Sequence, residues 1–164
     1  VPSPLLSSKS PFDIVWSSPP CELWSKLQNC WIGRKRKDGT IMTAEKITER
    51  INKYGKPIVD KTLEIIEYFK SGNPNLIYFI ENPKDSRMKG YIKLDRDIVS
   101  YCKYADWGYR KDTRIWSNVN GFIPKICKND CYCFPHKNLT IGTTILDRYR
   151  IPPELIRDLF CLII

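Results

Sequence analysis

The sequence predicts an α/β fold in which parallel strands are flanked by helices. Residues 12–16 form a short apolar run. Residues 76–80, LIYFI, form a continuous apolar and aromatic run that is typical of a strand buried on both faces. Between them, apolar residues recur at helical spacing over residues 59–69. A strand, a helix and a second strand in this order predict a parallel pair joined by a crossover helix.

The remaining elements follow from capping residues and helix breakers. Thr43 predicts the start of a helix over residues 44–53, and the Tyr-Gly-Lys-Pro run at 54–57 predicts its end. Further elements are predicted as strands at 98–102 and 114–116, and as an amphipathic helix after Pro152-Pro153 that ends near residue 162. The Ser- and Pro-rich residues 1–11 predict a loose lead-in. No internal repeat or linker divides the chain, so residues 1–164 are predicted to form one domain.

Composition narrows the class of protein. The chain of 164 residues carries 27 Lys and Arg against 18 Asp and Glu, a net charge of +9. This excess favours a polyanionic partner such as nucleic acid, while a basic composition that serves solubility alone stays open. Seven cysteines is an odd number, which argues against a closed disulfide framework and for reduced thiols inside a cell. No apolar run approaches the ~18 residues that span a bilayer, so no membrane partner is predicted.

A thiol and a carboxylate follow the two predicted parallel strands. Cys21 comes after the first strand, and Glu81-Asn82 comes directly after the second. Because ligands of an open α/β sheet bind at the carboxyl ends of its strands, both side chains are expected at the same edge. Pro19-Pro20 would make a stiff turn that holds Cys21 in place, as a nucleophile requires. Taken alone, the Pro-Pro-Cys run also fits a buried cysteine behind a turn.

Two further segments are candidates for binding. The first is an exposed basic loop that ends at the turn signal Asp38-Gly39 and contains Arg34, Lys35, Arg36 and Lys37. The second has the pattern Cys-x3-Cys-x-Cys-x2-His and contains Cys127, Cys131, Cys133 and His136, the one histidine of the chain. These four ligands could hold zinc tetrahedrally, and free thiols on a small loop are the alternative. The cysteines with apolar neighbours, which are Cys30, Cys102 and Cys161, are assigned to the core.

The order and spacing of the motifs resemble the cytosine-5 DNA methyltransferase family. The resemblance is carried by the segments WSSPPC (16–21), TLEIIEYF (62–69), FIENP (79–83), SYCKYADWGYRKDTRIWSN (100–118) and YRIPPELI (149–156). Pro-Cys and Glu-Asn are that family's catalytic motifs. The similarity is closest to the small methylase-like proteins of phages and large DNA viruses, and it extends from about Phe12 to Leu159.

The resemblance implies a partial Rossmann-like sheet of the S-adenosylmethionine-dependent methyltransferase type, with a small Cys/His loop. It also implies a reaction in which the Cys21 thiolate adds to carbon 6 of cytosine while Glu81 contacts ring nitrogen 3. Carbon 5 then takes a methyl group from S-adenosylmethionine. Arg114 matches the second arginine of the family's Gln-x-Arg-x-Arg motif and is included with the catalytic residues. Asp13 and Ser17, beside the Pro-Cys turn, are the candidates for contact with the cofactor.

DNA is the partner that the resemblance implies, and the location is intracellular: the cytoplasm or nucleus of a virus-infected cell, or the virion. The residues expected to contact nucleic acid are Ser25, Arg34, Lys35, Arg36, Lys37, Asn82, Arg110 and Lys111. Asp112 departs from the family, since it stands where the first motif arginine is expected.

The chain also contains no Gly-x-Gly, the core of the family's cofactor turn. Three explanations stay open: the chain is a fragment, a separate polypeptide supplies the cofactor half, or activity is lost. In the last case the protein is an inactive methylase-fold module that binds nucleic acid or serves as a viral structural or interaction protein.

Overall fold

The structure is a computed structural model that describes residues 12–139 and 143–163. The chain forms two compact units, Val1–Lys93 and Leu94–Ile164, and each is described by itself. The lead-in predicted at residues 1–11 lies outside the described residues, and the single domain over 1–164 stays a prediction. No described helix is long and apolar enough to cross a membrane.

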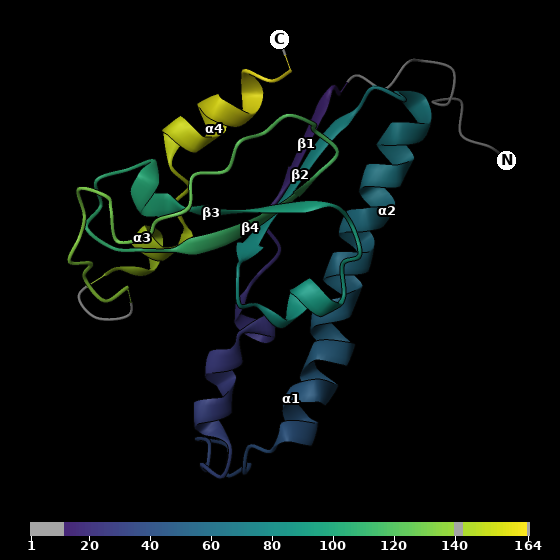
Figure 1. Cartoon of the computed structure of the whole chain (residues 1–164). Helices are drawn as coiled ribbons and strands as arrows, with labels where there is room; N and C mark the ends of the chain where they lie inside the picture. The colour runs from purple at the N-terminus through teal and green to yellow at the C-terminus, as the bar shows by residue number, and fades with distance from the viewer. Residues whose placement is uncertain (1–11, 140–142, 164) are drawn as a thin grey trace, which may run out of the picture. The chain divides into compact units, whose positions relative to one another are not determined.

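The first unit is built on the predicted strand–helix–strand arrangement. Strands β1 (Ile14–Ser17) and β2 (Ile77–Pro83) pair in parallel, with Ser17 opposite Ile80. Helix α2 (Lys56–Gly72) joins them and runs beside the pair (Figure 1). Strand β2 is buried along most of its length, as its apolar run predicts. It also extends further than expected, so that Glu81 and Asn82 are its last buried residues and do not follow it.

The predicted helix end at residues 54–57 is wrong. Helix α1 (Ala44–Arg50) continues through a π-helical turn, Ile51–Gly55, directly into α2 (Figure 1). Pro57 lies at the junction between the π-helical turn and α2, as the second residue of α2. Gly55 serves packing: a Cβ at this position would lie 3.1 Å from the indole of Trp24. The contact with Trp24 therefore accounts for a glycine at this position. The sequence pattern alone predicts that it ends the helix.

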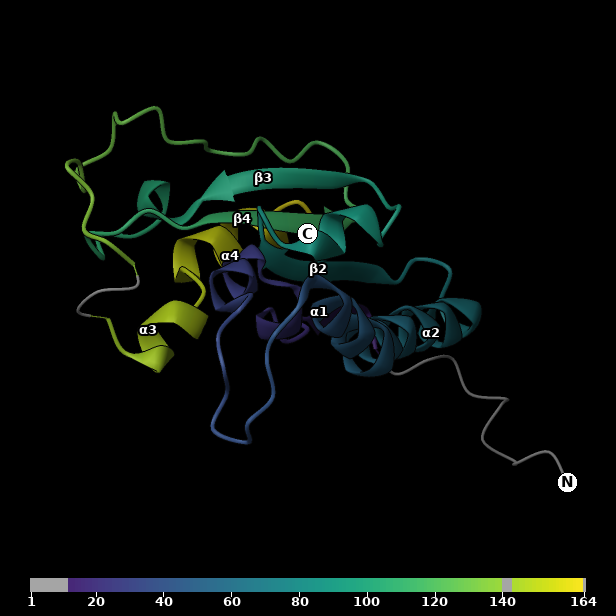
Figure 2. The same cartoon turned by 90° about the horizontal axis from the view of Figure 1, so that it is seen from below.

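The second unit contains an antiparallel pair. Strands β3 (Arg96–Ser100) and β4 (Asp112–Ser117) pair with Ser100 opposite Asp112, and Figure 2 shows them side by side. The predicted strands at 98–102 and 114–116 are thus found with shifted ends, and the 3-10 turn η5 (Tyr101–Lys103) follows β3. Because this pair is antiparallel, the parallel arrangement describes only the first unit, and the chain as a whole is a mixed α/β protein.

Two short helices complete the second unit. Helix α3 (Ile145–Tyr149) begins with a reciprocal capping box between Thr144 and Asp147. Helix α4 (Pro153–Phe160) is the predicted amphipathic helix, and it buries Leu155 and Leu159. It starts immediately after Pro152, as the proline pair predicts.

Candidate functional site

The turn that carries Cys21 is tied to the end of β2 by a side chain. The amide Nδ2 of Asn82 donates a hydrogen bond of 2.8 Å to the carbonyl oxygen of Pro19, and this contact is buried. Asn82 is 1% exposed, and its Oδ1 is a buried atom with no hydrogen-bond partner among the described residues. The Asn82 amide therefore fixes the first proline of the Pro-Pro-Cys run against the strand that contains Glu81.

The chain after the thiol is anchored as well. Cys21 is half-buried and precedes the 3-10 turn η1 (Glu22–Trp24), in which the N–H of Trp24 donates to the carbonyl of Cys21. Trp24 is 3% exposed, and its ring lies 5.5 Å from that of Tyr91, between centroids. Its other neighbour is the π-helical turn, at Gly55. Short side-chain contacts on both sides of Cys21 thus restrict where its sulfur can lie.

Glu81 lies at the same edge of the strand pair. Ser17, the last residue of β1, is opposite Ile80, so Glu81 is level with the start of the turn that leads to Cys21. The carboxyl-bearing side chain is buried, at 6% exposure. The thiol and the carboxylate therefore follow the same edge of the strand pair, as the sequence predicts. Glu81 lies within β2, however, and not after it.

A groove of about 590 Å³ opens beside the thiol. Its lining contains Cys21, Ser25, Lys26, Leu27, Pro83, Asp85 and Ser86. Glu81 is not part of this lining as the structure describes it. The groove brings Cys21 and Ser25 together, and the buried Glu81 precedes the groove residue Pro83 along β2. Ser25 uses its hydroxyl to accept the N–H of Leu27, which caps the next 3-10 turn.

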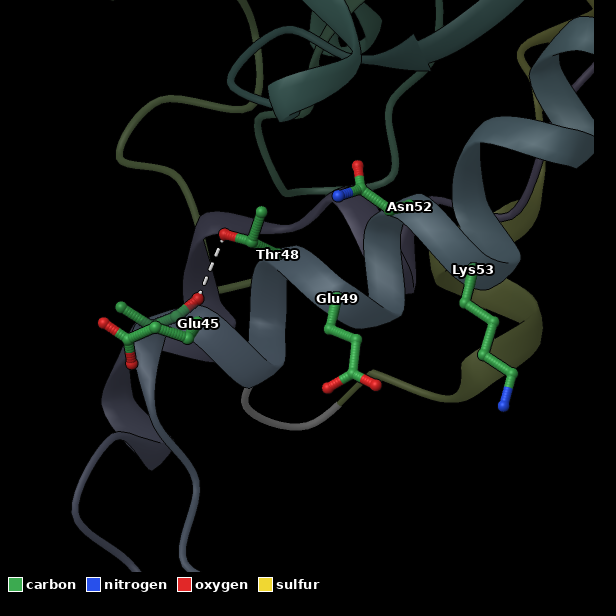
Figure 3. A pocket seen from close by; sticks show the side chains of 6 residues that line it. Glu45, Thr48, Glu49, Asn52 and Lys53 are labelled. Carbon is green, nitrogen blue, oxygen red and sulfur yellow. Dashed lines mark hydrogen bonds between the residues drawn. The ribbon is translucent and has the colours of Figure 1, made fainter.

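A second open depression, of about 650 Å³, lies on α1 and the π-helical turn (Figure 3). Its lining consists of Ala44, Glu45, Thr48, Glu49, Asn52 and Lys53. Thr48 donates its hydroxyl hydrogen to the carbonyl of Ala44, one turn earlier. All these residues come from one continuous helix, so their polar groups lie along a single face and do not converge on a ligand from several elements. The depression is therefore interpreted as an ordinary solvated helix face.

The predicted basic loop is a short hairpin. Backbone bonds join Arg36 to Thr40 and Gly33 to Met42, and an isolated antiparallel bridge joins Lys35 to Ile41. Figure 2 shows this segment, in blue, extending away from the start of α1. All residues from 31 to 39 are exposed. The cationic side chains therefore reach solvent, as the sequence predicts.

One aromatic ring accompanies the hairpin. The Arg34 guanidinium lies 5.6 Å from the ring centroid of Trp31, which is 53% exposed. An exposed indole beside several cations is the combination that serves both base stacking and phosphate contact.

The second unit gathers a Cys/His cluster, but its membership differs from the prediction. Ligand atoms of Cys102, Cys127, Cys131 and His136 all lie within 4.8 Å of one another. Cys133 is not among them, because its Sγ lies 3.6 Å from the carbonyl oxygen of Ala105. Cys102 was assigned to the core, and it is indeed buried, but its thiol faces the cluster. The core assignment of Cys30 and Cys161 is wrong, because both are exposed.

The thiols of the cluster perturb one another. Burial, followed by hydrogen bonds with the Cys127 and Cys131 thiols, raises the pKa of Cys102 far above its usual range. Burial alone would raise the pKa of Cys127 too. The N–H of Asn129 and the neighbouring thiols outweigh that effect, and the net pKa of Cys127 is lowered. Four soft ligand atoms gathered this closely form a set that could hold a metal ion.

Comparison with known proteins decides the family. The chain is 37% identical to the "Probable DNA (cytosine-5)-methyltransferase" of Frog virus 3 (isolate Goorha), over 90% of this chain and 74% of that protein. The chain belongs to the DNA (cytosine-5)-methyltransferase family. No protein-family model matches the chain, and no solved structure matches it.

Within this family, two residues are expected to contact the cofactor, and both are engaged with other side chains. Asp13 precedes β1, so it lies at the opposite end of the strand from Cys21, and its Oδ1 accepts a hydrogen bond from Asn73. Ser17 lies at the correct end, but its hydroxyl is 3.4 Å from that of Thr62 on α2. The start of a parallel strand is the edge opposite to the usual ligand-binding edge, and the cofactor contact of Asp13 stays a prediction.

The basic residues of the second unit occupy structural positions. Lys111 is 8% exposed, donates to the carbonyl of Arg148 and lies over the ring of Tyr101. Arg110 makes two hydrogen bonds to Asp112, which raises the pKa of Arg110. Lys111 thus makes internal contacts in this structure, and its contact with phosphate stays a prediction. Asp112, which stands where the family's first motif arginine is expected, is thus the partner of Arg110.

The structure also places two other predicted site residues, Arg114 and Asn82, in buried positions. Arg114, the family's motif arginine, is 6% exposed on β4, with its guanidinium 5.8 Å from the Trp116 ring. Asn82 was expected to touch nucleic acid, but it is buried and bonds the Pro19 carbonyl.

Sequence reasoning missed Arg87, which donates to the carbonyl of Ser25 and to the side chain of Asn29 and so braces the groove segment. No motif signals this role, since it depends on a long-range contact.

Proposed function

We propose that this chain acts on cytosine in DNA by covalent catalysis, with Cys21 as the nucleophile and Glu81 as its carboxyl partner. The observation that carries the proposal is the buried bond from Asn82 to Pro19, which ties the cysteine turn to the end of the strand that contains Glu81. Membership of the DNA (cytosine-5)-methyltransferase family supports the choice of substrate. The adjacent groove supplies a surface beside the sulfur on which a base can be held.

The chemistry follows from the electron demand of the ring. The Cys21 thiolate forms a bond from Sγ to carbon 6, and the electrons of the 5,6 double bond move toward the ring's N3–C4 side. Glu81 offers a proton at nitrogen 3, which keeps charge from accumulating on the ring. Carbon 5 then becomes the nucleophilic carbon of an enamine. Because the target base is inaccessible inside a duplex, it must first leave the base stack.

S-adenosylmethionine is the methyl donor in this family, and the two residues expected to contact it, Asp13 and Ser17, are engaged with other side chains. Asp13 also lies at the opposite end of the strand from Cys21. No step is therefore assigned to the donor. A separate polypeptide that carries the donor site is a partner consistent with this arrangement, and an intracellular, virus-related location follows from the same family membership.

The DNA-binding part of the proposal rests on the exposed hairpin. Its four consecutive cations, Arg34, Lys35, Arg36 and Lys37, are available for phosphate oxygens, which carry most of the affinity of such contacts. The exposed Trp31 beside Arg34 offers a face for an unstacked base.

Exchange of the hydrogen at carbon 5 tests the covalent step without the methyl donor. Once sulfur is bonded to carbon 6, carbon 5 can take up a solvent proton and release its original hydrogen, and the thiol then leaves. DNA carrying tritium at carbon 5 of cytosine should release tritium with the parent protein and with Cys30→Ser, an exposed cysteine away from the turn. Cys21→Ser should release none. Equal release by parent and Cys21→Ser would overturn the assignment.

A second candidate function is nucleic-acid binding by an inactive methylase fold. The engagement of Asp13 and Ser17 with other side chains and the exposed basic hairpin favour it. It predicts DNA binding that falls steeply with salt, with no tritium release by the parent, either alone or with S-adenosylmethionine added.

A further inference from the structure

The cluster in the second unit joins residues that are distant in sequence. Cys102 lies in η5, directly after β3, while Cys127, Cys131 and His136 lie in the segment between β4 and α3. Their four ligand atoms lie within 4.8 Å of one another. All four cysteine and histidine side chains are buried or half-buried. The sequence pattern alone points to Cys133 in place of Cys102, so this set is defined by the fold.

The distances within the cluster are those of a small coordination sphere. The Nε2 atom of His136 is 3.7 Å from Sγ of Cys127 and 3.1 Å from Sγ of Cys131. Zinc bonds of ~2.3 Å to sulfur and ~2.0 Å to nitrogen place tetrahedral sulfur and nitrogen ligands about 3.5 Å apart. The observed spacings bracket this value, so an ion needs only small shifts of the side chains.

Hydrogen bonds from backbone N–H groups hold the Cys127 side chain and backbone in place. The N–H of Asn129 points at the Cys127 sulfur at 3.3 Å, and Asn129 adopts a φ of 67° to make this tight turn. The N–H of Cys127 donates to the hydroxyl of Ser100, which in turn donates to Asp112. N–H groups aimed at a sulfur stabilise the thiolate that a metal requires, and such outer contacts hold a ligand in its orientation.

The charge of the surroundings suits an anionic centre. Three thiolates and one histidine around a divalent cation carry a net negative charge. Lys103, which is paired with Asp130 at 2.9 Å, and Arg110, which is paired with Asp112, both have attractive electrostatic interactions with cluster thiols. Two positive side chains thus favour an anionic centre, while each also pairs with an aspartate.

We propose that Cys102, Cys127, Cys131 and His136 bind one structural zinc ion. Soft thiolate and imidazole ligands select zinc over calcium or magnesium, and four protein ligands leave no open position for catalysis. The segment between β4 and α3, drawn in green in Figure 1, has no assigned helix or strand in its described residues. A long segment without helix or strand needs other interactions to hold one conformation. The ion would supply them by linking this segment to Cys102, directly after β3.

Metal analysis of the full-length chain tests the proposal without reference to activity. The parent purified without chelator should contain one zinc ion per chain, and Cys133→Ser should retain it. Cys102→Ser should lose it. These two variants form a matched pair, since Cys133 is nearer in sequence to the other ligands while Cys102 is nearer in space. After exchange into Co²⁺, the parent should show the visible absorption of a tetrahedral ion and charge-transfer bands from sulfur.

X-ray absorption of the zinc-loaded parent gives a check that does not depend on the folding of a variant. The proposal requires three sulfur neighbours and one nitrogen neighbour. A parent that takes up no stoichiometric zinc after reduction and reloading would overturn it. So would a loss of zinc in Cys133→Ser together with full retention in Cys102→Ser, or a zinc shell with fewer than three sulfurs.

Discussion

Replacing Asn82 with alanine tests the contact on which the proposed active site depends. The substitution removes the donor to Pro19 and leaves a buried carbonyl without a partner. A loss of this kind costs about 1–3 kcal/mol of unfolding free energy. Because the amide oxygen of Asn82 is itself buried without a partner, removing it offsets part of the loss. The net destabilisation expected is about 1–2 kcal/mol.

The effect on catalysis should be larger than the effect on stability. If the Pro-Pro-Cys turn relaxes by about 1 Å, the rate at Cys21 is expected to fall by about two orders of magnitude. Urea denaturation measures the first quantity, and tritium release from carbon 5 of cytosine measures the second. Asn52→Ala is the matched control, since Asn52 is exposed on the π-helical turn. Identical behaviour of Asn82→Ala and Asn52→Ala in both assays would refute the role given to this hydrogen bond.

Three further predictions concern packing, titration and DNA binding. Gly55→Ala should lower the unfolding free energy by about 1–3 kcal/mol because its new methyl group meets an indole, while Gly90→Ala, which has open space, should cost far less in the same urea titration. Hydrogen bonds from the backbone and hydroxyl of Thr144 hold the pKa of Asp147 below its usual value. This contribution to stability should be present above pH ~3.9 and lost as the pH falls through the lowered pKa. Thr144→Ala should return the pKa of Asp147 toward that value in a carboxyl NMR titration, and an unchanged pKa would contradict the capping box. If Arg36 neutralises one phosphate, Arg36→Gln should reduce the salt slope of DNA binding by about 0.9, and an unaltered slope would remove the hairpin from the interface.

Local patterns were sufficient where one short segment determines its own structure. The strand–helix–strand unit follows from apolar periodicity, and β1 and β2 pair in parallel as expected. The turn predicted at Asp38-Gly39 in the basic loop is also found, because such a turn favours a left-handed glycine and Gly39 has a φ of 82°. These features depend on neighbours in sequence.

Prediction from the sequence failed where a residue's role depends on a partner that is distant in sequence. Gly55 resembles a helix terminator in sequence, but the indole of Trp24 requires a residue without a side chain at this place. Cys133 fits the local spacing of a metal site, whereas the fold brings Cys102 from the end of β3. Lys111 resembles a surface cation, but it is drawn inward by the carbonyl of Arg148 and the ring of Tyr101. In each case the information lies in long-range packing.

The most direct test of Cys21 as the nucleophile is peptide mapping of a covalent protein–DNA adduct. An oligonucleotide in which 2-pyrimidinone replaces the target cytosine should accept a thiol at carbon 6 more readily and hold it longer. After digestion, mass spectrometry should find the modified base on the peptide that contains Cys21, and the adduct should vanish in Cys21→Ser while persisting in Cys30→Ser. An adduct on any other cysteine, or none on a folded protein that binds the oligonucleotide, would contradict the account.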